Sequence, residues 1–353
     1  MGMTTGIHQV TAGAVPRDAV TNHAYEWRRV MREMGLRSEI FTERDHIHPH
    51  LRGDVLPHTD WDAITQPGDV AIIHYSIGSP AFEYVLARAS RTVLDYHNIT
   101  PAELLWEDAP GVALECSMGR RELATLVGRV EATAADSSFN AEELARMGFD
   151  TATVTGVVRP PLPQAERGRT DDGRLRLLFV GRGAPNKAQH DLILALTALR
   201  EAGVDAELRL VGTWEGMEAY EDRCRALAAR LDMEDHVHFS GSVGDTQLAQ
   251  EYADADVFVC LSEHEGYCVP AIEAIVAGLP VVAFARGALP ETVGGAGILL
   301  PDKAPSIVAE AVLMATGDPS VRSAMAAARP GHLAELAPEA VAARLRAVSE
   351  SLL

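Results

Sequence analysis

The stretch EHEGYCVPAIE, from Glu263 to Glu273, decides how the rest of the chain is interpreted. It follows the apolar run 257–261 (VFVCL), which predicts a buried strand, and it leads into 271–278, which predicts a short helix. Pro270 suits the first position of that helix, and Gly278 suits its end. A strand, a polar loop and a helix N-terminus in this order indicate an anion site, because backbone N–H groups and the positive end of the helix dipole are offered there.

Two carboxylates bracket this loop. Glu265 lies within the loop, and Glu273 lies in the first turns of the predicted helix. Carboxylates in these places can accept hydrogen bonds from hydroxyls while the backbone holds a phosphate, which is what binding of a sugar nucleotide requires. Acidic residues are also common at helix starts without any ligand, so the interpretation depends on a second element upstream.

The second element is GRGAPNKAQH at 181–190, which directly follows a strand predicted over 175–180. Arg182 and Lys187 stand in the loop before a predicted helix, where a forked donor and a point charge suit a diphosphate. Their role would be electrostatic, since charge develops on a nucleotide as it leaves. The alternative is two solvated cations in a loop. An NAD site is disfavoured because the third glycine and the downstream acid of the dinucleotide fingerprint are missing.

Composition limits the class of protein. The chain has 353 residues, which favours two domains, and a net charge of −19, which argues against a nucleic-acid partner and against adhesion to anionic membranes. Its four cysteines form no C-x-x-C pair, which favours reduced thiols in a cytoplasmic protein. No apolar run reaches the length of a membrane helix, and the first ten residues lack the pattern of a signal peptide. We therefore expect no stable membrane insertion.

Strand-like and helix-like stretches alternate through both halves of the chain, which predicts an α/β fold with two parallel sheets in two Rossmann-like domains. The proline-rich run 159–163 and the polar tract after it predict a linker. The expected boundaries are a first domain at 1–160, a linker at 161–173, a second domain at 174–335 and a final helical segment at 336–353. Two such domains leave a central cleft, with ligands at the carboxyl ends of the strands.

The motifs resemble those of a known enzyme family. FVGR at 179–182 with Lys187, and Glu265-Gly266 with Pro270 and Glu273, look like the C-terminal domain of retaining GT-B glycosyltransferases. The most similar family is glycosyltransferase family 4 (glycosyl transferases group 1), whose signature is two glutamates with seven residues between them. The first half is similar to a bacterial branch that serves polysaccharide and secondary-metabolite synthesis, through DAVTN (18–22), HYSIG (74–78), YHNITP (96–101) and DSSFN (136–140).

The resemblance covers nearly the whole chain and implies roles for individual residues. It implies that Arg182 and Lys187 bind the donor diphosphate and that Glu265 binds the sugar hydroxyls, helped by the backbone N–H groups of Gly266, Tyr267 and Cys268. It also implies that Glu273 binds the ribose and that the backbone of Val243 contacts the base.

The first domain and the reaction are also covered by the resemblance. It implies that His97 approaches the donor sugar across the cleft, that the loop around Gly13 closes over the phosphates, and that the helix from about Pro338 crosses back to the first domain. The Gly13 loop reads AGAVP, whereas the family often has paired glycines there. Retention of anomeric configuration follows, with the acceptor attacking on the face that the nucleotide leaves and a donor phosphate oxygen taking the proton.

Two further patterns are typical of metal sites but are interpreted otherwise. Asp254-Ala255-Asp256 resembles the D-x-D motif of another glycosyltransferase class, yet it directly precedes a core strand. His46, His48 and His50 alternate, but without acidic or cysteine partners at ligand spacing, which favours a surface loop. His74 suits a buried strand end and an acceptor site equally. We expect no metal and no other cofactor, since the nucleotide sugar is a co-substrate.

The expected function is therefore a cytoplasmic, retaining, metal-independent hexosyltransferase. It would move a hexosyl group from a nucleotide sugar, UDP-sugar in preference to GDP-sugar, to a hydroxyl of a glycan, lipid-linked or small-molecule acceptor. One alternative is a glycoside phosphorylase or sugar-nucleotide epimerase of the same fold. Another is a non-catalytic sugar-nucleotide-binding partner protein, against which the intact set of Arg182, Lys187, Glu265 and Glu273 argues. The sequence predicts neither the acceptor nor the oligomeric state.

Overall fold

The computed structural model describes residues 5–168 and 172–353. Residues 1–4, which begin the stretch inspected for a signal peptide, and residues 169–171 of the predicted linker lie outside the described residues. The chain divides into two compact units, one made of Met1–Ile99, Leu114–Pro160 and Glu335–Leu353, the other of Thr100–Ala113 and Pro161–Ala334. The segment 100–113, assigned to the first domain from the sequence, thus groups with the second unit.

The first unit is built on a parallel sheet with the strand order β3-β2-β1-β4-β5-β6-β7. Its strands are β1 (Ile7–Thr11), β2 (Ile40–Thr42), β3 (Leu56–Pro57), β4 (Val70–Tyr75), β5 (Arg91–Tyr96), β6 (Ala132–Ala135) and β7 (Thr153–Val154). The helices that accompany it are α1 (Ala19–Glu33), α2 (Trp61–Ile64), α3 (Pro80–Leu86), α4 (Pro110–Ala124), α5 (Ser138–Met147) and α13 (Pro338–Ser351). Helix α4 begins in the second unit and continues into the first.

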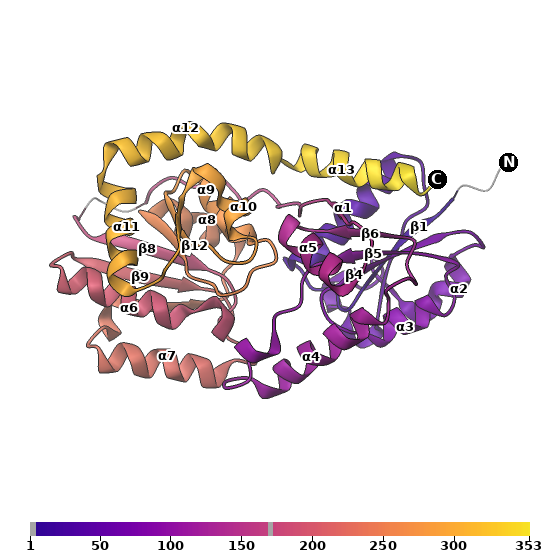
Figure 1. Cartoon of the computed structure of the whole chain (residues 1–353), viewed down its shortest axis with the longest axis horizontal. Helices are drawn as coiled ribbons and strands as arrows, with labels where there is room; N and C mark the ends of the chain where they lie inside the picture. The colour runs from indigo at the N-terminus through magenta and orange to yellow at the C-terminus, as the bar shows by residue number, and fades with distance from the viewer. Residues whose placement is uncertain (1–4, 169–171) are drawn as a thin grey trace. The chain divides into compact units, whose positions relative to one another are not determined.

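The second unit repeats this plan, with the strand order β10-β9-β8-β11-β12-β13 and parallel pairing throughout the described residues. Its strands are β8 (Leu175–Val180), β9 (Ala206–Val211), β10 (Val237–Gly241), β11 (Val257–Cys260), β12 (Val281–Phe284) and β13 (Ile298–Leu300). Its helices are α6 (Gln189–Glu201), α7 (Glu218–Arg230), α8 (Asp245–Asp254), α9 (Val269–Val276), α10 (Leu289–Val293), α11 (Pro305–Gly317) and α12 (Pro319–Glu335). Helices α6 and α7 lie on one side of the sheet, and α8, α9 and α10 on the other (Figure 1).

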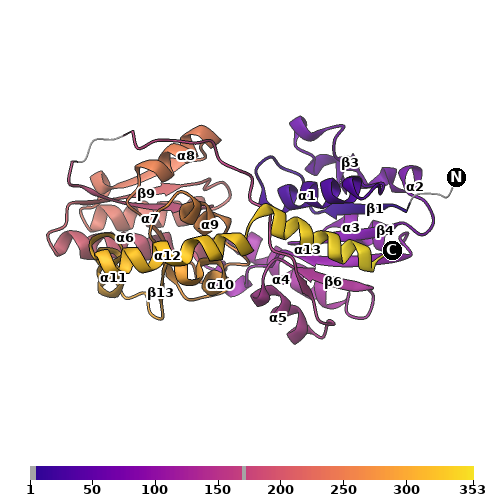
Figure 2. The same ribbon diagram turned by 90° about the horizontal axis from the view of Figure 1, so that it is seen from above.

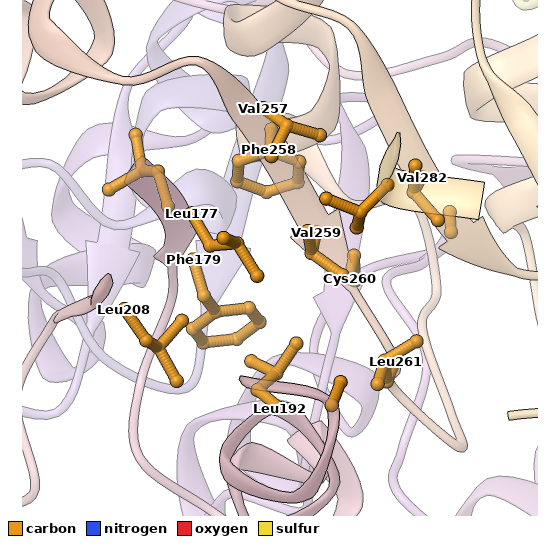
Figure 3. Close-up of a cluster of buried hydrophobic side chains, with 14 of the residues drawn as sticks. Leu177, Phe179, Leu192, Leu208, Val257, Phe258, Val259, Cys260, Leu261 and Val282 are labelled. Atoms are coloured by element: carbon orange, nitrogen blue, oxygen red, sulfur yellow. The ribbon is translucent and has the colours of Figure 1, made fainter. Parts of the chain in front are cut away.

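The core of the second unit explains why its strands are nearly continuous apolar runs. Side chains from β8, β9, β11, β12 and α6 meet in one cluster (Figure 3). Every residue of β11 is fully buried, because helices cover both faces of this central strand. Burial of this apolar surface is the main force that holds the two loops at the strand ends in place.

The last helix belongs to the first unit. Val341 and Leu345 of α13 are fully buried and join the cluster around Trp27 of α1. The guanidinium of Arg344 donates a 2.8 Å hydrogen bond from Nε to the carbonyl oxygen of Thr155. Both views place α13 alongside α1 (Figures 1 and 2). Helix α13 is therefore attached by an apolar stripe and by a polar contact at its side.

Helices were harder to predict from the sequence than strands. Helices α3, α4, α5 and α12 were not predicted, and α12 contains Pro330 within its length. Strand β6 ends at Ala135, and two residues later Ser137 caps α5 by accepting the N–H of Asn140 at 3.1 Å. Among the described residues, no helix combines the length and the apolar character needed to cross a bilayer.

In both sheets the strand order reverses at one place, between β1 and β4 in the first unit and between β8 and β11 in the second. Connections leave such a point toward opposite faces of the sheet, so the carboxyl ends of the two strands open a crevice where ligands bind in α/β proteins. The two stretches that the sequence analysis singled out follow β8 and β11.

Candidate functional site

Two loops flank the reversal point of the second unit, 181–188 after β8 and 261–268 after β11. Asn186 ties them together, because its side-chain amide donates to the carbonyl oxygen of His264 at 3.4 Å and its own carbonyl accepts the N–H of Glu263 at 2.8 Å. The sequence analysis gave Asn186 no role. Its effect is long-range, and a polar residue next to a lysine in a loop carries no local signal of it.

Lys187 and Glu265 meet between these loops. Lys187 Nζ lies 2.6 Å from Glu265 Oε2, with the two side chains 23% and 8% exposed. Burial disfavours the ammonium, but the attraction of the Glu265 carboxylate outweighs it and raises the pKa of Lys187 above its usual value. The lysine is therefore charged at neutral pH and still partly open to solvent, as a group that binds an anion must be.

Glycines allow the close approaches that place this pair. A Cβ on Gly183 would lie 2.1 Å from the ring of Trp214, so only glycine fits in the β8 loop there. Gly287, at φ +57°, lies against the backbone of Glu265, where a Cβ would come within 2.5 Å of the Glu265 carbonyl oxygen. That oxygen accepts the N–H of Ala288 at 2.9 Å, which fixes the loop carrying Glu265.

Helix α9 begins at the end of the same loop. Cys268 is its N-cap in a left-handed conformation at φ 70°, and Pro270 lies within the first turn. Gly266, Tyr267 and Cys268 thus form the turn that enters the helix, and the hydroxyl of Thr292 donates to the carbonyl of Tyr267. The predicted strand, loop and helix are all present, with the proline at the start of the helix as expected.

Glu273 projects from α9 and is held by a tyrosine. Glu273 is only 9% exposed, and its Oε2 accepts a 2.8 Å hydrogen bond from the hydroxyl of Tyr252. Tyr252 belongs to α8 and is itself buried. The sequence analysis did not find Tyr252, because its partner is 21 residues away and on another helix.

A hollow of about 490 Å³ lies at the ends of β9 and β10. It is lined by Trp214, Phe239 and Arg225, by the backbone turn 240–242 directly before Val243, and by Thr213, Glu215, Glu218 and Glu221. Arg182 is exposed and donates from Nη2 to the carbonyl of Glu215 at 3.3 Å, which places it at the edge of this hollow. An aromatic hollow with the exposed guanidinium of Arg182 at its edge suits a flat base with an attached phosphate group.

In the first unit, His97 lies at the end of β5 in a buried chain of hydrogen bonds, and its side chain is only 2% exposed. Its Nε2 lies 2.9 Å from His74 Nδ1, and its Nδ1 lies 3.0 Å from Asp136 Oδ2. His74 Nε2 in turn lies 3.1 Å from Gln9 Oε1. Both nitrogens of His97 are therefore already bonded within the unit.

Asp95 forms the centre of the same cluster. Its Oδ2 accepts the indole N–H of Trp27 at 2.8 Å and lies 3.2 Å from His23 Nε2 and 3.3 Å from His74 Nδ1. Burial disfavours the charged carboxylate, but the neighbouring imidazoles His97 and His23 hold the pKa of Asp95 well below its usual value. This cluster was not predicted, because its members come from four separate elements.

The protons of the histidine pair follow from the geometry. Burial lowers the pKa of His74 to about 4. Burial also acts to lower the pKa of His97, but the carboxylates of Asp136 and Asp95 outweigh this effect and raise the pKa to about 9. The planes of the two rings differ by 16°, and the ring centroids lie 5.2 Å apart. Because the facing nitrogens are only 2.9 Å apart, the rings lie end to end in nearly the same plane. His97 is the cation and donates its Nε2 proton to neutral His74.

Three sets of buried side chains among the described residues bring possible metal-ligand atoms within 4.8 Å of one another: His74, Asp95 and His97; His23, Asp95 and Asp136; and Cys260, Glu265 and Cys268. In the first set, the end-to-end alignment aims the two imidazole nitrogens at each other rather than at a common third point. That arrangement suits a shared proton better than a cation.

Other residues from the sequence analysis lie elsewhere. Gly13 has open space, with His46 O the nearest atom at 3.8 Å from an added Cβ. His46 and His50 are exposed, and His46 Nδ1 lies 3.0 Å from the carbonyl oxygen of Ala12. Asp254 accepts the N–H of Gly168 at 2.8 Å and Asp256 that of Arg176 at 2.9 Å, so both bond to backbone around the start of β8.

A second cavity, of about 650 Å³, lies wholly within the first unit. Its lining includes four glutamates, Glu43, Glu83, Glu115 and Glu122, and among the described residues that line it none is a lysine or arginine. The lack of a side chain at Gly78 leaves room for Glu122, because a Cβ at position 78 would lie 2.1 Å from Glu122 Oε2. The HYSIG motif at 74–78 pointed to this region, but the glutamates come from other segments and were not found.

Comparisons with known proteins place part of the chain in a known family. Residues 164–330 match the family described as glycosyl transferases group 1. D-inositol 3-phosphate glycosyltransferase of Kineococcus radiotolerans is 35% identical over 196 residues, covering 51% of this chain and 45% of that protein. The MMP alpha-(1->4)-mannosyltransferase of Mycolicibacterium hassiacum is 37% identical over 126 residues, covering 35% and 29%. The chain spans about half the length of the curated inositol-phosphate relatives that it matches.

Solved structures are similar over nearly the whole chain. Sucrose-phosphate synthase from Thermosynechococcus elongatus matches with a TM-score of 0.74 and 17% identity, covering 99% of both chains. Anabaena HepE in complex with UDP and glucose matches with a TM-score of 0.69 and 17% identity, also covering 99% of both chains. At these identities the likeness shows the fold alone, and it confirms the predicted fold class.

Proposed function

Because this chain belongs to the group 1 glycosyltransferases and has their GT-B fold, we propose that it moves a hexosyl group from a nucleotide sugar to an acceptor hydroxyl. The observation that carries the proposal is the Lys187–Glu265 pair, 2.6 Å apart and partly open at the reversal point of the second unit. A cation and a carboxylate side by side match the two halves of such a donor, the diphosphate and the sugar hydroxyls.

We assign the remaining donor contacts around this pair. Arg182 joins Lys187 at the diphosphate, the N–H groups of Gly266, Tyr267 and Cys268 complete the anion site, and Glu273 binds the ribose. The hollow beside Val243 receives the base, with Trp214 and Phe239 as its aromatic walls. UDP is preferred to GDP, and support comes from the Anabaena HepE structures of the same fold, which contain UDP or UDP-glucose.

The chemistry that we propose retains the anomeric configuration and uses no metal. Lys187 and Arg182 stabilise the charge that develops on the departing nucleotide, and they do so without reorganising, because the loop is already fixed by Asn186 and Gly287. The acceptor hydroxyl attacks on the face that the nucleotide leaves, and the donor phosphate takes its proton. His97 is assigned to the sugar side of the reaction, where a hydroxyl would reach a ring nitrogen only by displacing His74 or Asp136.

The acceptor is assigned to the acidic cavity of the first unit. Carboxylates accept hydrogen bonds from hydroxyl and amino groups, and the lining offers no lysine or arginine for a phosphate among the described residues. We therefore expect a polyhydroxylated acceptor without a phosphate at this cavity, in contrast to the inositol 3-phosphate in the name of several relatives. A cytoplasmic location is proposed as well, because all four cysteines are free thiols.

Calorimetric titration with UDP, GDP and ADP, without added metal, tests the donor assignment. We expect micromolar binding of UDP, lost in Arg182→Ala, followed by slow hydrolysis of one UDP-sugar. Phosphate-dependent cleavage of the donor would favour a phosphorylase, and conversion of the sugar nucleotide without an acceptor would favour an epimerase. Binding without turnover, across a panel of polyol and glycan acceptors, would favour a non-catalytic partner protein.

A further inference from the structure

Two of the four cysteines meet behind the donor loop. Cys260 ends β11 and Cys268 is the N-cap of α9, and their sulfur atoms lie within 4.8 Å of each other and of a carboxylate oxygen of Glu265. Cys260 Sγ also lies 3.3 Å from the hydroxyl oxygen of Ser262. Both are buried, with Cys260 fully so and Cys268 8% exposed. The other two thiols, Cys116 and Cys224, belong to α4 and α7.

The backbone at Cys268 is held in an unfavourable conformation. Its φ of 70° lies in the left-handed region, which is unfavourable for a residue with a Cβ and which glycine adopts freely. Such outliers persist only where the surroundings hold them, and they gather at functional sites. Here the conformation brings the thiol of Cys268 to that of Cys260, at the entry to the helix that we assign to the donor phosphates.

We propose that Cys260 and Cys268 form an oxidation site, in which a hydroperoxide converts the thiol pair into a disulfide. One sulfur, as thiolate, attacks the peroxide, forms a sulfenic acid and releases one molecule of water or alcohol. The second thiol then attacks the sulfenic sulfur, forms the S–S bond and releases a second molecule of water. Two electrons pass from the sulfurs to the peroxide, and a dithiol reductant reverses the change.

The surroundings assign the two sulfurs different parts. The Cys268 thiol, as the hydrogen-bond donor, lowers the pKa of Cys260, and the same bond raises the pKa of Cys268. Cys260 is thus the easier thiol to ionise, while Cys268 is the one with an opening to solvent. A molecule as small as hydrogen peroxide is the oxidant that this geometry admits, since a bulky disulfide cannot reach a sulfur that is 8% exposed or less.

Closing the bond would change the donor loop. An S–S bond is about 2.05 Å long with a fixed dihedral preference, so two sulfurs that now lie within 4.8 Å of each other must approach and turn. Cys268 is three residues from Glu265, and the shift would displace the N–H groups of 266–268 and the partner of Lys187. The expected loss of nucleotide binding rests on the proposed function, whereas formation of the disulfide does not.

The experiment treats the full chain with hydrogen peroxide, alkylates free thiols and maps the linked peptides by mass spectrometry, with UDP binding measured before and after. We expect a Cys260–Cys268 disulfide, at least a tenfold loss of UDP affinity, and recovery on adding dithiothreitol. Cys260→Ser should bind UDP normally and lose the sensitivity to peroxide. Cys224→Ser, the matched control in the same unit, should stay sensitive.

Each other outcome overturns part or all of this inference. Over-oxidation without a disulfide, or a disulfide mapped to another pair, would contradict the oxidation site. If the Cys260→Ser variant does not fold, Cys260→Ala takes its place in the experiment. If the disulfide forms but UDP binding is unchanged, the oxidation site exists but does not regulate donor binding. If the reduced protein binds no nucleotide, the proposed function fails, but peptide mapping still decides whether the oxidation site exists.

Discussion

The reversal points of the two sheets carry opposite kinds of polar chemistry. In the first unit, Asp95, His74 and His97 lie at or beside the ends of β4 and β5 and are almost completely sealed, with side-chain exposures of 0%, 0% and 2%. In the second, Lys187 is 23% exposed and Arg182 is open to solvent. A polar group sealed from solvent can reach a ligand only if its surroundings open, whereas an exposed one needs no such change. The difference favours an architectural role for Asp95 and His74 and ligand binding for Lys187 and Arg182, while His97 could reach a ligand only by giving up His74 or Asp136.

Removing the central charge of the sealed cluster should give the largest effect. Asp95→Asn keeps the shape of the side chain but leaves His97 without one of its two carboxylates, and we expect unit 1 to lose about 3 kcal/mol or more of unfolding free energy. Urea unfolding followed by tryptophan fluorescence measures this. Asp62→Asn is the matched control, because its ion pair with Arg88 is exposed and should contribute under about 1 kcal/mol. Equal effects of the two variants would contradict a structural role for the cluster.

Breaking the open pair should affect turnover more than stability. Lys187→Ala removes the cation from the donor diphosphate, and we expect the rate of donor cleavage to fall about 10²–10³-fold. Glu265→Gln should act on the same step, and the double variant should lose less than the two single losses combined, because the two side chains act as a unit. Release of UDP from the donor is the measurement. Arg200→Ala, which removes another cation of the second unit, paired to the exposed Asp205 at 3.0 Å, serves as the control and should stay close to the normal rate.

The sequence predicted the open set far better than the sealed one. Lys187 and Glu265 lie in the loops that directly follow two predicted strands, so their place beyond the strand ends could be predicted locally. The sealed cluster joins Trp27 to Asp95 across 68 residues, and no local pattern records that contact. The same reason explains the missed roles of Asn186 and Tyr252, which depend on partners in other loops and helices.

The ends of strands, helices and domains could likewise be predicted only where a local sequence signal marks them. The strand 175–180 was predicted to the residue, and the fully apolar run 257–261 to within one residue of β11, because burial on both faces leaves a clear signal in such runs. Helix α12 was missed because Pro330 lies inside it, and a proline in sequence normally predicts a helix end. The grouping of 100–113 with the second unit depends on contacts such as Arg223 with Asp108 at 2.9 Å, which no composition shift announces.

The sealed cluster should also make stability depend on pH. Carboxylates raise the folded pKa of His97 to about 9, so its contribution is complete below its ordinary pKa and is lost as pH rises through about 9. We expect the unfolding free energy to fall by up to roughly 3 kcal/mol between pH 7 and 10. His74, with a folded pKa lowered to about 4, acts in the opposite direction and weakens the fold as pH falls from about 6.5 to 4. His97→Gln should flatten the alkaline limb, and an unchanged limb would contradict the assigned cation.

The smallest expected effect lies at the boundary between the two kinds of site. Glu273 is almost as buried as the sealed cluster, at 9% exposure, yet it is assigned to the ribose. Tyr252→Phe keeps the ring in the core but removes the hydroxyl that donates to Glu273 at 2.8 Å and lies 3.2 Å from the carbonyl oxygen of Pro270 in the same helix. If Tyr252 positions Glu273 for the ribose, UDP affinity should fall by about 1 kcal/mol, roughly five-fold, with little change in the rate of the bound donor. Tyr220→Phe is the matched control, since this buried tyrosine bonds His190 instead and should leave affinity unchanged. A loss of stability in Tyr252→Phe without a loss of affinity would place Glu273 with the sealed, architectural residues instead.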